Sequence, residues 1–92
     1  MGDKEFNSAL HSIINSCEKG NYIYAKKQVE AKLFGKLTDE QHAGIESLLD
    51  LICVASKIQR VCKDKEEAHD LIQDNIEYYG VDFEALKPEM AK

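Results

Sequence analysis

The stretch LTDEQHAGIESLLDLICVASKIQRV, residues 37–61, predicts a helix with a defined N-terminal cap and two apolar stripes. Thr38 is the candidate N-cap, and Gln41 follows three positions later, which is the spacing of a capping box. One stripe comprises Ile45, Leu48, Leu49, Ile52 and Ala55, and the other comprises Leu51, Val54, Ile58 and Val61. A helix that is buried on one side needs only one such stripe.

The second stripe therefore needs a cover. Fully burying one such side chain is worth roughly 1.5–3 kcal/mol, so leaving four of them in water is costly. Either the predicted fourth helix and the C-terminal turn cover the stripe, or a second chain does. The second arrangement predicts a symmetric homodimer about this helix.

Two helices are predicted before this stretch. The first has one apolar face, made of Phe6, Leu10, Ile13, Ile14 and Cys17. It ends at Gly20, because glycine readily takes the positive φ found at helix C-termini. The second runs from about residue 21 or 22 to residue 34 and ends at Gly35. Its inner side carries Tyr22, Ala25, Val29 and Leu33.

A fourth helix is predicted after this stretch. Asp64 and Glu67 repeat the capping-box spacing, and Gly80 closes the helix. Its inner side carries Ala68, Leu71, Ile72, either Asn75 or Ile76, and Tyr79. Val81 follows where a hydrophobic residue often packs back on a helix end. Asp82 is a candidate cap for one further short turn.

No segment alternates between apolar and polar residues with period two, so no sheet is predicted. The fold class is all-α: a compact four-helix bundle of antiparallel helical hairpins, with room for a short fifth helical turn at the C-terminus. Ninety-two residues suffice for one core, so we predict a single helical domain over residues 1–92.

Composition limits where the protein acts. No unbroken apolar run approaches 18 residues, which predicts no membrane span. The N-terminus lacks the basic flank and apolar core of a secretory signal. The three cysteines are odd in number and have no C-x-x-C spacing, which indicates free thiols. We therefore predict a cytoplasmic protein.

Charge is unevenly distributed along the chain. From Asp64 onward there are nine acidic and three basic residues, a net charge of −6, whereas residues 1–63 carry +1. An acidic C-terminal third disfavours direct binding to nucleic acid, which needs clustered lysine and arginine. These acids form either a solvated helix face or a surface for a basic partner.

The corner between the first two helices resembles a tetratricopeptide-type helical hairpin. Gly20, Tyr22 and Ala25 match the glycine, aromatic and alanine positions of that motif over residues 5–37. Ser12, Ile13, Ser16, Lys32 and Leu37 depart from it, and the pattern does not recur one repeat later. The resemblance implies a helical protein that binds other proteins.

The sequence carries no catalytic, metal or cofactor motif. His11, His42 and His69 lie apart, whereas zinc motifs on a helix place two histidines on one face. There is no nucleophile elbow, calcium loop or phosphate-binding glycine loop. We therefore predict that the protein is not an enzyme and uses no cofactor and no metal.

Three functional hypotheses follow. The first is a protein-binding module, an adaptor, chaperone or inhibitor that binds its partner stoichiometrically. Its candidate partner-binding residues are Ile23, Tyr24, Phe34, Leu51, Val54, Ile58 and Val61. The second is a small-ligand binder with a pocket between helices or at a dimer seam, using Tyr22, Tyr24, Lys26 and Lys27. The third is an acidic mimic of nucleic acid that blocks a basic protein.

Overall fold

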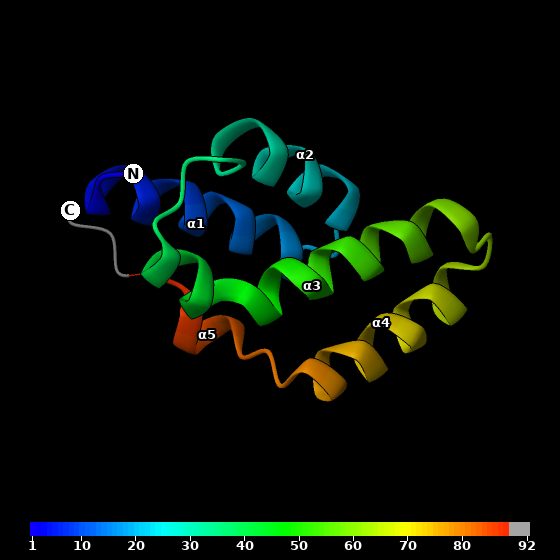
Figure 1. Ribbon diagram of the computed structural model, residues 1–92. Helices are drawn as coiled ribbons and strands as arrows, with labels where there is room; N and C mark the ends of the chain where they lie inside the picture. Colours follow the sequence, from blue (N-terminus) through cyan, green and yellow to red (C-terminus); the bar gives the residue numbers. More distant parts are fainter. Residues whose placement is uncertain (89–92) are drawn as a thin grey trace.

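Figure 1 shows the computed structural model of the chain, which describes residues 1–88. Within those residues there are five helices and no strand: α1 (Asp3–Glu18), α2 (Tyr22–Lys32), α3 (Asp39–Val61), α4 (Lys65–Tyr79) and α5 (Phe83–Leu86). Successive long helices run in opposite directions, and each packs on the next one along the chain (Figure 1). The predicted all-α bundle with a short fifth helix is confirmed. The last four residues of the predicted domain lie outside the described ones.

Side-chain caps fix where the helices begin. The capping box of α3 is confirmed, with the Gln41 N–H donating to Thr38 Oγ1 and the Thr38 N–H donating to Gln41 Oε1, both at 3.1 Å. The predicted box at the start of α4 is wrong in its second partner. Asp64 accepts from the N–H of Glu66 at 2.9 Å, because its short carboxylate reaches the second helical position. Asp82 caps α5 as predicted.

Two helices end in the same backbone motif. Gly20 and Gly80 have φ values of +79° and +66°, which only glycine adopts without strain. At each, the N–H of the following residue reaches back to a carbonyl five positions earlier: Asn21 to Ser16 at 2.9 Å, and Val81 to Ile76 at 3.1 Å. Val81 is buried, as predicted.

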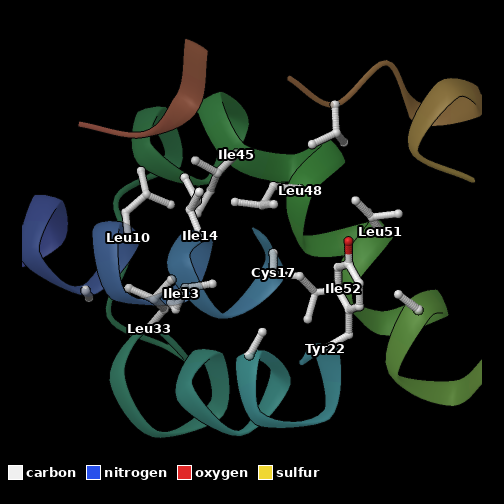
Figure 2. Close-up of a cluster of buried hydrophobic side chains, with 14 of the residues drawn as sticks. Leu10, Ile13, Ile14, Cys17, Tyr22, Leu33, Ile45, Leu48, Leu51 and Ile52 are labelled. Atoms are coloured by element: carbon white, nitrogen blue, oxygen red, sulfur yellow. The ribbon is translucent and has the colours of Figure 1, made fainter. Parts of the chain in front are cut away.

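The core lies between α1, α2 and α3, and α4 completes it from one side. Figure 2 shows Leu10 and Ile14 of α1 beside Ile45 of α3, and Ile13 of α1 beside Leu33 at the end of α2. From the C-terminal part, Ile72 and Val81 join the same buried cluster. One continuous cluster therefore links all four long helices.

The second apolar stripe of α3 is covered mainly by the chain itself. In Figure 1, α4 lies along α3 on the side away from α2. Leu51 is fully buried, Val54 and Ile58 are partly buried, and Val61 at the helix end is 73% exposed. The homodimer stays a prediction, but the stripe that motivated it has its cover within one chain.

One predicted core residue of α4 faces solvent instead. Leu71 is 41% exposed, whereas its neighbours Ala68 and Ile72 are buried. The reason is geometric: α4 packs closely on α3 alone, so only one narrow face of α4 is covered, and Leu71 lies about 100° around the helix from Ile72.

Candidate functional site

The predicted partner-binding residues occupy separate places. Leu51 lies in the core and presents no surface to a partner. Val54 and Ile58 are partly buried, and Val61 is exposed at the C-terminal end of α3. Ile23 lies at the corner between α1 and α2. Tyr24 is half exposed on α2. Among these residues, only Phe34 stands beside an apolar groove.

The position of Phe34 follows from the turn that ends α2. Both the Leu33 and Phe34 N–H groups donate to the carbonyl of Val29, at 2.9 and 3.0 Å. Leu33 is buried and anchors this turn, whereas the next residue, Phe34, is 79% exposed. Because consecutive residues of a tight turn point to different sides, anchoring Leu33 inward directs Phe34 outward.

The groove runs between α2 and α3 on both sides of Phe34. One hollow of about 510 Å³ is lined by Lys26, Glu30, Ile52 and Cys53, and a second of about 310 Å³ by Leu33, Gly35, Leu37, Asp39 and His42. Val29, Phe34 and Leu49 line both hollows. We call the two together the Phe34 groove.

Charges at the Phe34 groove nearly balance. Lys26 and Glu30 stand on the α2 side, and Asp39 and His42 on the α3 side. The remaining lining is mostly apolar, so contact with this groove is governed by burial of apolar surface more than by net charge. Cys53 is an exposed free thiol within it.

At the opposite end of α2, Gln59 of α3 holds the corner between α1 and α2. Its Oε1 accepts from the N–H of Tyr22 at 3.0 Å and of Ile23 at 3.3 Å, and its Nε2 donates to the carbonyl of Gly20. Asn21 adds a local cap by accepting from the N–H of Tyr24. Three orphan backbone groups at the start of α2 are thus satisfied.

A small polar network joins α1 to α2. The hydroxyl of Ser16 donates to Gln28 Oε1 at 3.0 Å, and Gln28 Nε2 donates to the hydroxyl of Ser12 at 2.8 Å. Ser16 and Gln28 are buried. The two serines occupy positions where the tetratricopeptide pattern expects other residues, and here they form the polar side of the helix interface.

Apart from the Phe34 groove, a hollow of about 550 Å³ lies between this corner, the end of α3 and the side of α4 that carries Ala68 and Ile72. We call it the corner cleft. Cys17 and Tyr22 lie at its inner end. Burial raises the pKa of Cys17 from its usual 9.0 to about 12, with the nearby Glu18 carboxylate adding to the effect. Burial likewise raises the pKa of Tyr22 from 10.0 to about 12, so both groups are protonated at neutral pH.

The residues predicted for a small-ligand site are not brought together. Tyr22 faces the corner cleft, whereas Lys26 lines the Phe34 groove. Tyr24 and Lys27 are exposed on α2 and line neither hollow. Neither Gln59 nor the lysines of the corner cleft could be identified from the sequence, because no local pattern shows that residues 37 positions apart are in contact.

Within residues 1–88, no group of three or more histidine, cysteine, aspartate or glutamate side chains is arranged to bind a metal ion. In the same part of the chain, no helix combines the length and the apolar character needed to cross a bilayer. Comparison of the chain with models of protein families, with curated proteins and with solved structures found no match.

Proposed function

We propose that this protein is a small helical binding module that acts by stoichiometric contact with another protein, as an adaptor, chaperone or inhibitor. The observation that carries the proposal is Phe34, which is 79% exposed above an apolar groove. A large aromatic side chain left in water beside unfilled apolar hollows is typical of a surface where binding energy concentrates.

The occupant that best fits the Phe34 groove is an amphipathic helix of the partner. The groove lies between two antiparallel helices, which is the setting in which a third helix lays its apolar face. The described residues offer no sheet edge for a partner strand. The nearly balanced lining charges favour a helix with a mixed polar face.

The proposal assigns the protein no catalytic step and no cofactor. A cytoplasmic location is part of it, since the three cysteines are unpaired thiols. Self-association through the Phe34 groove is the alternative to a different partner. Blocking of a basic protein by the acidic C-terminal third is a separate hypothesis. The salt dependence of partner binding distinguishes it from binding at the Phe34 groove.

The test uses a synthetic amphipathic helix with leucines at i, i+3, i+4 and i+7 and alternating glutamate and lysine elsewhere. We expect it to bind, and we expect Phe34→Asp to weaken binding roughly thirtyfold or more, the loss typical of a central aromatic contact. Tyr78→Asp is the matched control, because Tyr78 on α4 is 81% exposed and lies outside the groove. A scrambled peptide of the same composition is the second control.

Cys53 supplies a direct readout of the site. In a Cys62→Ser background, Cys53 is the exposed thiol, and Cys17 is buried. Bound peptide should slow alkylation of Cys53, and binding should change little between low and high salt. If Tyr78→Asp weakened peptide binding as much as Phe34→Asp, or if bound peptide left the alkylation rate of Cys53 unchanged, the peptide would not bind in the Phe34 groove. Steep weakening by salt would favour the acidic-mimic hypothesis.

A further inference from the structure

The corner cleft is lined by a tyrosine whose hydroxyl group has no hydrogen-bond partner among the described residues. Tyr22 is only 4% exposed and lines the cleft, yet its hydroxyl makes no hydrogen bond with any described residue. Within residues 1–88, every fully enclosed side-chain oxygen or nitrogen has a partner, so the Tyr22 oxygen must reach open space. Figure 2 shows its ring extending from α2 toward Leu51, with the hydroxyl at the tip.

Positive charge gathers around this cleft in a protein whose net charge is −5. Lys19 and Lys65 line it, together with His69. The one acidic side chain of the lining, Glu18, is already paired with Lys87, at 2.9 Å between Nζ and Oε1. In the described part of the chain, neither lysine forms an ion pair. Nearby Asp64 uses its carboxylate to cap α4.

The remaining walls suit the apolar part of a small molecule. Cys17, Ala68 and Ile72 form apolar surface, and Gln73 adds an amide at the side. The cleft has a volume of about 550 Å³. This falls within the range of small-molecule sites, which is roughly 300–1,000 Å³. Apolar walls, one hydroxyl without a protein partner and two lysines without an ion pair in the described part of the chain together define a recognisable ligand chemistry.

We propose that the corner cleft binds a small organic anion, a carboxylate or a phosphate ester with an apolar body, whose charge lies near Lys19 and Lys65 and which accepts a hydrogen bond from the Tyr22 hydroxyl. This site is separate from the Phe34 groove and does not depend on partner binding there. A tyrosine hydroxyl is protonated at neutral pH and can donate a hydrogen bond, so Tyr22 serves as the donor.

The test is titration of the isotope-labelled full chain, followed through its backbone amide signals. The probes are benzoate and phenyl phosphate, with benzyl alcohol as the neutral analogue and benzylamine as the cationic one. We expect saturable shifts at the amides of Gly20, Ala68 and Ile72 with at least one anion, and weaker binding of the two analogues. Which anion binds more tightly distinguishes a carboxylate from a phosphate ligand.

Two conservative variants probe the named contacts. Tyr22→Phe removes only a hydroxyl that has no described protein partner, so the fold is kept, and it should weaken anion binding about tenfold. Lys65→Ala should weaken it about two- to fivefold, whereas Lys57→Ala, an exposed lysine outside the cleft, should leave it unchanged. The proposal would be overturned if benzylamine bound as tightly as the anions, or if neither anion gave a saturable shift. Shifts confined to residues of the Phe34 groove would also overturn it.

Discussion

Gln59 of α3 accepts a hydrogen bond at 3.0 Å from the backbone N–H of Tyr22, the first residue of α2. The same carboxamide also serves Ile23 and Gly20, so one side chain satisfies backbone groups on both sides of the α1–α2 turn. Because Asn21 is the only local cap, the start of α2 depends on a residue of another helix. This contact fixes the corner against α3 and shapes the corner cleft.

We expect Gln59→Ala to lower the free energy of unfolding by about 1–3 kcal/mol, because it leaves the N–H groups of Tyr22 and Ile23 without their partner. Urea unfolding monitored by circular dichroism measures the change. Gln73→Ala is the matched control, since Gln73 is exposed on α4 and makes no side-chain hydrogen bond with the described residues. Its effect should stay within about 0.5 kcal/mol. Equal losses in both variants would show that Gln59 does not hold the corner.

Leu51 and Val61 belong to one apolar stripe, but they should respond differently to a charge. Leu51 is fully buried beneath α4, so Leu51→Asp places a carboxylate in the core and should cost about 3 kcal/mol or more. Val61 is 73% exposed at the end of α3, and Val61→Asp should cost less than about 1 kcal/mol. Helicity and urea midpoints of the two variants measure this.

The outcome also bears on the predicted homodimer. If Leu51→Asp stays folded while an oligomer seen in the wild type dissociates, then the stripe is an interface between chains, and its burial under α4 would be contradicted. Loss of helicity in a monomer is the result that the packing of α4 on α3 leads us to expect.

Gly44 and Gly80 should respond to alanine with opposite signs. Gly80 has φ +66°, so Gly80→Ala should destabilise the protein by about 1 kcal/mol. Gly44 lies inside α3, and apart from its neighbours and the local helix backbone, a Cβ there would meet nothing within 4 Å. Gly44→Ala should therefore stabilise by up to about 1 kcal/mol. Thermal melts of the pair measure both changes, and a loss of stability in Gly44→Ala would mean that the bend at Ile45 depends on Gly44.

Local patterns predicted most of the fold because helix ends are encoded locally. Thr38 with Gln41, and Gly80 with Val81, lie within a few residues of the bonds they make. The bend in α3 could not be foreseen in this way: Ile45 has φ −125° and ψ 15°, although it belongs to the predicted apolar stripe. Its side chain still belongs to the buried core cluster, so the bend does not take this residue out of the core.

The candidate sites were predicted less well because they are made by contacts between helices. Phe34 was identified from its aromatic character, but its groove exists only where Leu49 and Cys53 of α3 come beside α2. Tyr22 was expected on the inner side, and that is correct. Its neighbours in the corner cleft come from the end of α1 and from α3 and α4, and a single sequence does not show that Lys19 and Lys65 meet there.

The thiol of Cys17 and the hydroxyl of Tyr22, both at the corner cleft, should make the protein less stable at alkaline pH. Cys17 has its pKa raised from 9.0 to about 12, and Tyr22 from 10.0 to about 12, in both cases chiefly by burial. Above pH 9 the unfolded chain releases the Cys17 proton while the folded chain keeps it. The folded state then binds more protons, so stability is complete below about pH 9 and falls as pH rises toward 12.

For Cys17 alone the expected loss is about 1.4 kcal/mol between pH 8 and pH 10, and Tyr22 adds to it above pH 10. Urea unfolding at pH 8, 9 and 10 under reducing conditions measures it. Comparing Cys17→Ala with Cys53→Ala tests the buried thiol, because each variant removes one thiol, and only Cys17 is buried. The Cys17→Ala protein should lose less stability over this interval than the wild type, and Cys53→Ala should follow the wild type. Parallel curves for all three would mean that the Cys17 thiolate is tolerated in the folded state.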